Sequence, residues 1–198
     1  NVDYSCVVES PDVASIYEVP LRLHEQGLDR EVCQRLRLET PEPDLSHWSG
    51  MVETIIHPKD RVRIAVVGKY TDLADSYKSV QEALVHGGIA NGVGVQINWV
   101  SSDQFTDLDT ARTVLAGYDG LLIPGGFGIR GVEGMVQAVA GARAGKLPFF
   151  GICLGMQVAI IEFARHVCRL DDSNSSEFAP ECAHPVIALM ESQHAVTD

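Results

Sequence analysis

The residues best placed to do chemistry are Gly151-Ile152-Cys153-Leu154-Gly155, which separate an apolar segment from the helix-forming segment MQVAIIEFAR. A nucleophile with glycine two residues away on either side is typical of an abrupt turn from a strand into a helix. Such a turn strains the backbone at the nucleophile, and larger side chains beside it would collide. It also places Cys153 at a helix N-terminus, whose partial positive charge favours the thiolate. We therefore predict that Cys153 is a nucleophile.

A glycine-rich loop, Pro124-Gly125-Gly126-Phe127-Gly128, precedes the cysteine by one predicted strand. Attack by a thiolate on an acyl group creates an oxyanion, which backbone N–H groups stabilise best where no side chain intrudes. The N–H groups of Gly126 and Leu154 are the natural pair for such an oxyanion hole. A buried structural thiol beside a tight turn is the alternative reading of the cysteine motif. The loop, the preceding apolar segment and the following helix favour the nucleophile.

The elements that must position these residues alternate regularly from Arg61 onward. Strand-like patterns cover residues 62–67, 93–100, 120–123 and 147–153. Helical spacing of apolar residues covers 76–90, 110–116, 132–144 and 155–167. This alternation predicts an α/β fold with a doubly wound, flavodoxin-like parallel sheet. Ligands of such sheets bind beyond the carboxyl ends of the strands, where the loop after Gly68, the glycine-rich loop and Cys153 fall.

Composition argues against several classes of function. The chain has 198 residues and a net charge of −12 without a Lys/Arg-rich run, so we expect no nucleic-acid or membrane partner. No apolar run approaches the roughly 20 residues needed to cross a bilayer. Five cysteines without a CxxC pair argue against a disulfide framework and against structural zinc. We predict no metal ligands, and we expect a reducing, cytoplasmic location.

The first 60 residues have a different character. Apolar residues between Asp12 and Leu38 have loosely helical spacing and predict short helices, whereas TPEPDLSHWSG predicts a connector. We therefore expect three parts: residues 1–39, a linker over 40–60, and the α/β domain over 61–198. The chain does not begin with Met, which indicates either processing or a chain cut out of a longer protein, and we favour the second reading.

Several longer motifs together resemble one family. GKYTDLADSYKSVQEAL, PGGFGIRGVEGM, GICLGMQVAIIEFARHV and NSSEFAPECAHPVIALM resemble the glutaminase domain of the CTP synthase family, and SIYEVP, HEQGLD and DLSHW resemble the end of its synthetase domain and its linker. The resemblance covers essentially the whole chain. It implies a class I glutamine amidotransferase domain, truncated at its C-terminal end. Ammonia released there from L-glutamine would aminate UTP to CTP in a reaction driven by ATP and Mg²⁺.

The resemblance also implies roles for individual residues. Cys153 would be the nucleophile, and the glutamine pocket would comprise Gly126, Leu154, Gly155, Met156, Gln157 and Glu177. Glu177 would hold the α-amino group, since an ammonium in a partly closed pocket needs a carboxylate partner. Arg130, Gly131 and Glu133 would belong to a lid that responds to GTP, the expected allosteric effector. Pro11, Asp12 and Val13 match a segment whose backbone meets the adenine of ATP. The family forms tetramers, so a homo-tetramer is expected of the full-length enzyme.

Parts of both expected active sites are missing from the sequence. A thiolate nucleophile of this kind needs a histidine and an acid to orient it, and in the family both lie far downstream of the cysteine. His184 and His194 do not match them. The sequence contains no GxxxxGK[ST] phosphate-binding run. We therefore expect a fragment that neither makes CTP nor turns over glutamine efficiently, and whose four-stranded sheet has an uncovered edge.

Three alternatives remain open at this point. One is another class I glutamine amidotransferase, of the GMP synthase or anthranilate synthase type. The FGIRGVEG loop and the attached SIYEVP and DLSHW segments argue against it. A second is a non-catalytic regulatory or assembly fragment, which would have no need of the cysteine and its two glycines. A third is a thiol hydrolase or redox sensor, which would not need Gln157 or Glu177.

Overall fold

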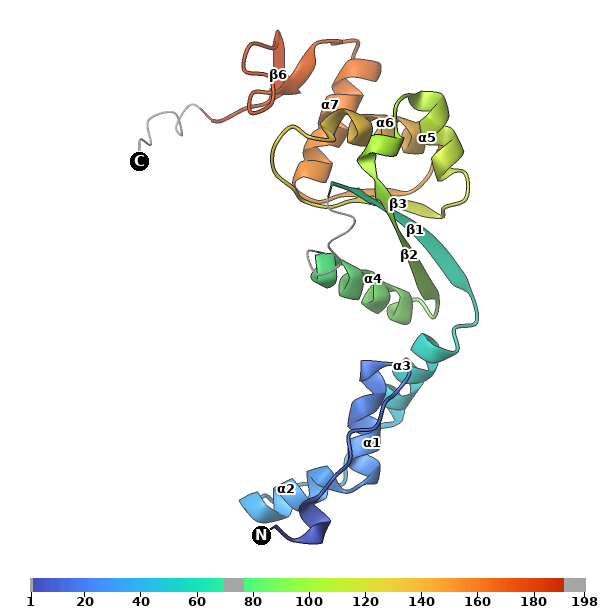
Figure 1. Ribbon diagram of the computed structural model, residues 1–198, viewed down its shortest axis with the longest axis vertical. Coiled ribbons are helices and arrows are strands. Elements are labelled where there is room, and N and C mark those ends of the chain that lie inside the picture. Colours follow the sequence, from blue (N-terminus) through green and yellow to red (C-terminus); the bar gives the residue numbers. More distant parts are fainter. Residues whose placement is uncertain (1, 70–76, 191–198) are drawn as a thin grey trace. The chain divides into compact units, whose positions relative to one another are not determined.

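The computed structural model describes residues 2–69 and 77–190 (Figure 1). The chain divides into two compact units. Unit 1 comprises residues 1–61 and 85–94, and unit 2 comprises residues 62–84 and 95–198. Helix α4 (Lys78–Ala90) therefore begins in unit 2 and ends in unit 1.

Unit 1 consists of short helices that bury little surface. Its elements are η1 (Tyr4–Cys6), η2 (Ile16–Glu18), α1 (Val19–Glu25), α2 (Leu28–Leu36) and α3 (Ser46–Ile56). Neither α1 nor α2 buries a residue, and α3 buries Val52. Polar contacts join these segments instead. The Gln26 side chain exchanges hydrogen bonds with the backbone of Glu9, and Trp48 Nε1 donates to the carbonyl oxygen of Tyr17 at 2.8 Å.

The short helices predicted between residues 12 and 38 are confirmed, but the segment predicted as a connector contains helix α3. Trp48, Met51, Val52 and Ile55 recur at helical spacing there, and this pattern outweighs the Pro, Ser and Gly content. Because a linker between domains can contain a helix, the limits 1–39 and 40–60 stay a prediction.

Unit 2 is built on a four-stranded sheet of order β2-β1-β3-β4. The strands are β1 (Arg61–Gly68), β2 (Gly94–Ser101), β3 (Gly120–Ile123) and β4 (Phe149–Gly151). β1 pairs with β3, and β3 with β4, in parallel. This strand order is flavodoxin-like, so the predicted fold is confirmed. The strand predicted over 147–153 is shorter than expected, because the chain leaves the sheet after Gly151 to turn at Cys153.

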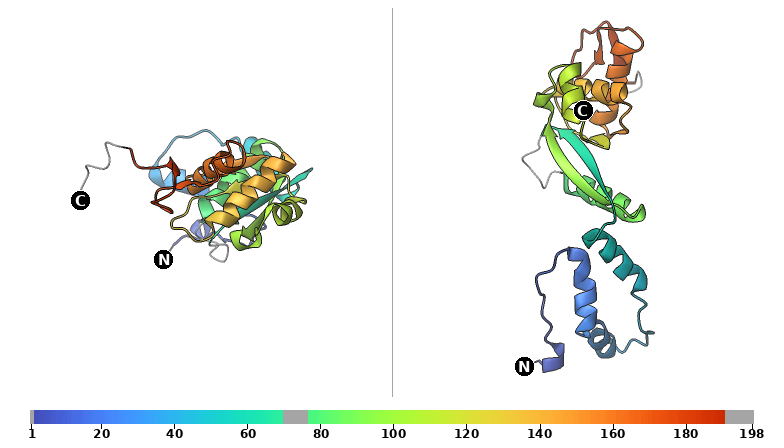
Figure 2. Two further views of the ribbon diagram at one scale, coloured as in Figure 1. Left: turned by 90° about the horizontal axis from the view of Figure 1, so that it is seen from above. Right: turned by 90° about the vertical axis from the view of Figure 1, so that its right-hand side faces the viewer.

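Helices cover both faces of this sheet. On one face, α5 (Leu108–Leu115), α6 (Val132–Gly145) and α7 (Leu154–His166) pack together, yellow-green to orange in Figure 2. They share a hydrophobic cluster with alternate strand residues, namely Ala65, Val67, Leu121 and Ile123, and with Val100 of β2. Trp99, the neighbour of Val100, points to the other face, where Tyr77 stacks on it with ring centroids 5.2 Å apart. Tyr77 directly precedes α4, so the start of α4 covers this second face.

The chain continues after α7 into two strands that the sequence pattern did not predict. β5 (Ser173–Ser175) and β6 (His184–Ile187) form a separate parallel pair, and α7 packs against both. β5 consists of Ser and Asn residues and β6 contains Pro185, and residues of these types have low strand propensity. This pair positions the segment that carries Glu177.

The outer side of β4 and α7 is apolar and exposed. β4 is the last strand in the sheet order, and Phe150 on it is exposed, as are Met156, Ile160 and Phe163 on α7. The expected uncovered edge is thus present among the described strands. None of the described helices is both long and apolar enough to cross a lipid bilayer.

Candidate active site

Cys153 occupies the turn between β4 and α7. Its backbone has φ 52° and ψ −105°, a conformation that residues with a side chain rarely adopt. The side chain is exposed to solvent. The predicted turn from strand to helix is therefore confirmed in geometry, and the nucleophile candidate is accessible to a substrate.

Gly151 and Gly155 make this turn sterically feasible. A Cβ atom on Gly155 would lie 2.1 Å from the carbonyl oxygen of Ile123, and one on Gly151 would lie 2.5 Å from the carbonyl carbon of Gly155. Both distances are far below van der Waals contact, and the obstructing atoms belong to the backbone. The start of α7 can therefore press against the end of β3 only because these positions are glycines.

Helix α7 begins directly after Cys153. Cys153 caps the helix, its carbonyl oxygen accepts from the N–H of Gln157 at 3.1 Å, and the first turn holds no acidic residue. Leu154 is the first residue of α7, and the N–H groups of a first turn have no acceptor within the helix. The positive end of the helix dipole thus favours negative charge at the Cys153 position.

The glycine-rich loop that follows β3 lies directly against this turn. A Cβ atom on Gly125 would be 3.6 Å from Cys153 Cβ, and one on Gly126 would be 3.4 Å from Leu154 Cδ2. Leu154 is buried and belongs to the hydrophobic core. The structure therefore places Gly125 against Cys153 and Gly126 against Leu154, and the oxyanion role of the Gly126 and Leu154 N–H groups stays a prediction.

The other residues predicted for a glutamine pocket differ in their exposure and in their distance along the chain from Cys153. Gly155 is buried beneath the turn, Met156 is exposed, and Gln157 is half-buried on the first turn of α7. Glu177 is exposed on the segment after β5, where its N–H donates to Ser175 Oγ at 3.2 Å. No described contact joins Glu177 to Cys153, so its role stays a prediction.

The three residues predicted for an effector lid have different environments. Arg130 is exposed, and its Nη2 lies 3.9 Å from Oδ2 of Asp103. Gly131 precedes α6 with φ 73°, and a Cβ there would lie 2.3 Å from Ser102 Oγ. The carboxylate of Glu133, however, accepts a two-pronged hydrogen bond from Arg165 at 2.7 and 3.1 Å. In this structure Glu133 therefore joins α6 to α7.

Lys69 lies against the glycine-rich loop, and the sequence pattern did not predict this contact. It follows β1 directly, and its Nζ donates to the carbonyl oxygens of Phe127 and Gly128 in the glycine-rich loop. Burial lowers the pKa of Lys69, while the charge of Glu177 raises it and that of Arg130 lowers it further. One feature of the sequence could have identified it. Lys69 lies in the loop after Gly68, at the carboxyl end of a parallel strand, where ligands of such sheets bind.

Histidine and metal chemistry are not assembled around Cys153 in the described residues. The histidine side chains that hydrogen-bond there do so elsewhere: His24 with Asp29, His86 with Tyr17, and His166 with Glu162. His194 lies outside the described residues. Within residues 2–69 and 77–190, no group of three or more His, Cys, Asp or Glu side chains could hold a metal ion.

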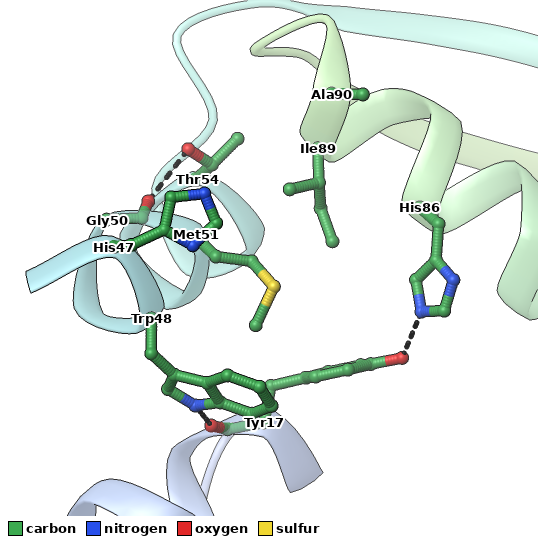
Figure 3. Close-up of a pocket in the computed structure, with 9 residues that line it drawn as sticks. All are labelled: Tyr17, His47, Trp48, Gly50, Met51, Thr54, His86, Ile89 and Ala90. Carbon is green, nitrogen blue, oxygen red and sulfur yellow. Dashed lines mark hydrogen bonds between the residues drawn. The ribbon is translucent and has the colours of Figure 1, made fainter. Parts of the chain in front are cut away.

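Unit 1 carries the predicted ATP-contacting segment and a cavity of its own. Pro11, Asp12 and Val13 belong to a segment without regular structure just before η2. A cavity of about 780 Å³ is lined by Tyr17, Trp48 and Met51 together with His86 and Ile89 (Figure 3). The Tyr17 hydroxyl lies 2.6 Å from His86 Nε2. None of the residues predicted for the active site lines this cavity.

Comparisons with known proteins agree with the geometry of unit 2. The profile of the family "Glutamine amidotransferase class-I" matches residues 72–192. A solved structure described as the glutaminase domain of Trypanosoma brucei CTPS with bound acivicin superposes with a TM-score of 0.63 and 45% sequence identity. That match covers 67% of this chain and 51% of the other.

Curated relatives extend the similarity over the whole chain. CTP synthases of Geotalea uraniireducens (strain Rf4) and Clostridium acetobutylicum are 50% and 49% identical to it over 198 residues. The chain spans 37% of the length of each of these relatives. The resemblance to CTP synthases is thereby confirmed, and the family profile covers more than half of the residues. The chain belongs to the class-I glutamine amidotransferase family.

Proposed function

We propose that this chain supplies the glutaminase centre of a CTP synthase, with Cys153 attacking the side-chain amide of L-glutamine. The observation that carries the proposal is the strained turn at Cys153, which Gly151 and Gly155 permit by close backbone contact. Strain of this kind persists where function requires it, since it costs about 1–3 kcal/mol. The turn exposes one thiol at the positive end of a helix beside a glycine-rich loop.

The chemistry follows from this placement. The Cys153 thiolate adds to the amide carbon of glutamine, and the carbonyl oxygen becomes an oxyanion that accepts hydrogen bonds from the N–H groups of Gly126 and Leu154. The leaving nitrogen then takes up the proton that the Cys153 thiol gave up, the C–N bond breaks to release ammonia, and a thioester remains on Cys153. Water hydrolyses the thioester to glutamate and restores the thiol. Glu177 would hold the α-ammonium group of glutamine, while Met156 and Gln157 would line the pocket.

Proton transfer sets a limit on turnover. A cysteine nucleophile of this type needs a base to accept its proton and an acid to return a proton to the leaving amine. The hydrogen-bonded histidines of the described residues have partners other than Cys153. We therefore propose that this 198-residue chain presents Cys153 as a nucleophile but that both its acylation by glutamine and its turnover of glutamine are inefficient.

The wider activity is proposed by likeness to the relatives. Ammonia from this centre would aminate UTP to CTP in an ATP-dependent step, in a homo-tetrameric enzyme regulated by GTP through Arg130, Gly131 and Glu133. Pro11, Asp12 and Val13 would contact the adenine of ATP. The described residues contain no cluster of three or more His, Cys, Asp or Glu side chains that could hold a metal ion. All five cysteines are free, which accords with a cytoplasmic location.

A direct test is mass-spectrometric mapping of the chain after exposure to acivicin, with free L-glutamine as competitor. Selective modification of Cys153 that glutamine suppresses is expected. Cys168 is also exposed and serves as an internal control, because it lies on no turn of this kind. Cys153→Ala should abolish the labelling.

The outcomes separate the alternatives. Equal labelling of Cys153 and Cys168 would exclude a formed glutamine pocket and would favour a non-catalytic fragment. Selective labelling without suppression by glutamine would favour a thiol hydrolase or redox sensor. A class-I glutamine amidotransferase with another acceptor would pass this test, and ammonia-dependent amination of UTP by the longer protein distinguishes it.

A further inference from the structure

We propose that Lys69 is a positioning residue that fixes the oxyanion loop, defined as residues 124–131, so that the N–H of Gly126 stays aimed at the acyl group on Cys153. The inference rests on the proposed glutaminase function and deepens it. It assigns to the residue after β1 a task in the reaction that the motifs around Cys153 do not reveal.

The oxyanion loop has little packing of its own in its middle. Phe127 is 86% exposed and Ile129 is 65% exposed, so neither side chain anchors the backbone. Gly128, between them, adopts φ 75°. The ends are better held: a Cβ on Gly68 would be 3.7 Å from Pro124 Cγ, and Gly131 abuts Ser102. The unanchored middle directly follows Gly126, the expected oxyanion donor.

Lys69 spans this unanchored part. Its stem passes Gly131, where a Cβ would lie 3.6 Å from Lys69 Cγ, and its ammonium group donates to the carbonyl oxygens of Phe127 and Gly128. Both of these acceptors belong to the unanchored middle of the oxyanion loop. Hydrogen bonds from an ammonium are stronger than neutral ones. Two of them on adjacent carbonyls fix the direction in which this backbone faces.

The charge of Lys69 is affected by residues expected at the substrate site. Burial and the nearby Arg130 lower the pKa of Lys69, and Glu177 opposes both by favouring the ammonium form. Glu177 is also the residue proposed to hold the α-ammonium group of glutamine. The same carboxylate thus stabilises the charge that holds the loop and the charge of the expected substrate.

The test compares rates of Cys153 alkylation in the whole chain. The probe is the chloroketone analogue of glutamine, whose reaction forms a C–S bond, expels chloride and passes through an oxyanion. Iodoacetamide is the second reagent, since its displacement reaction needs no oxyanion hole. Lys69→Met keeps the stem and removes the donor, and Lys69→Arg restores donors. Lys78→Met is the matched control, because Lys78 pairs with Glu82 on the surface of α4.

Lys69→Met should lower the maximal rate of chloroketone labelling by about tenfold to a hundredfold, the scale of a misplaced oxyanion donor. The half-saturating concentration and the iodoacetamide rate should change less than threefold, and Lys69→Arg should recover most of the rate. Wild-type chloroketone rates in Lys69→Met would overturn the inference, as would an equal loss with both reagents, which signals a structural effect. If the wild-type chain is not labelled selectively at Cys153, the proposed function itself fails.

Discussion

The two units of the chain are held together by different kinds of contact. In unit 2, α5, α6 and α7 pack on the sheet around one continuous cluster of buried apolar side chains. In unit 1, α1 and α2 bury no residue, and Val32 and Leu36 on α2 stay exposed. An exposed ion pair between Arg35 and Asp3 joins α2 to the segment before η1. Exposed pairs contribute about 0–1 kcal/mol each, whereas burying one large apolar side chain contributes about 1.5–3 kcal/mol.

This difference in packing indicates that unit 2 is the more stable unit and that it carries the candidate active site. The candidate active site lies wholly in the unit that has a core, so its strained turn is supported by surrounding packing. Unit 1 has few buried apolar side chains to stabilise it, because α1 and α2 bury none and α3 buries only Val52. We expect unit 2 to fold as the more stable body and unit 1 to open first.

The largest expected effect comes from breaking the close packing beneath Cys153. Gly155→Val would place side-chain atoms against the carbonyl oxygen of Ile123, only 2.1 Å from the Cβ position. Because backbone must shift, we expect unit 2 to lose more than about 3 kcal/mol of unfolding free energy. Urea denaturation followed by Trp99 fluorescence measures this loss. Gly145→Ala is the control, since a Cβ there meets nothing within 4 Å; equal midpoints for both variants would refute the packing account.

A smaller loss should follow from removing a buried charge in unit 2. Glu162 is 1% exposed, and its carboxylate accepts from Arg143 at 2.8 and 3.0 Å and from His166 at 3.0 Å. Glu162→Gln should cost about 2 kcal/mol, because the interaction is charge-assisted and buried on one side. Thermal unfolding checks this value. Glu31→Gln in unit 1 is the matched change at a more exposed pair, and a comparable drop in Tm there would contradict the contrast between the units.

The order in which the units unfold can be read from the two tryptophans. Trp48 belongs to unit 1 and Trp99 to unit 2, and the chain has no others. Trp99→Phe leaves Trp48 as the reporter, and Trp48→Phe leaves Trp99. We expect the Trp48 signal to change at lower urea concentration than the Trp99 signal. Coincident transitions in both variants would show that the units unfold together.

The smallest expected effect is a difference in acid sensitivity. In unit 1, a hydrogen bond from His24 lowers the pKa of Asp29, and one from Cys6 lowers the pKa of Glu31. In unit 2, hydrogen bonds from Thr110 lower the pKa of Asp107. A carboxyl group with a depressed folded pKa stabilises the fold above its unfolded pKa of 3.8 or 4.5, and this contribution is lost as pH falls through the folded value. Between pH 6 and pH 3 the Trp48 midpoint should therefore fall more than the Trp99 midpoint, and an equal fall would remove this distinction.

The parts predicted correctly from sequence are those set by local chemistry. The turn at Cys153 depends on glycines two residues away, and the strands and helices of unit 2 follow from apolar periodicity. Lys69 escaped prediction because its hydrogen-bond acceptors lie 58 and 59 residues away. Glu133 likewise meets Arg165 across 32 residues, a pairing that no local pattern contains. β5 and β6 are too short to carry a periodic signal, and packing against α7 decides their structure.

The positive φ of Cys153 also bears on how such a chain would change if its task were lost. Glycine adopts this backbone conformation without steric strain, whereas cysteine does not. Replacement of Cys153 by glycine would therefore relieve the strain in the turn while ending the proposed chemistry. A gene copy no longer selected for glutamine hydrolysis would gain by such a substitution. Cysteine at a position whose backbone favours glycine is explained by the proposed reactivity of the thiol and not by the fold.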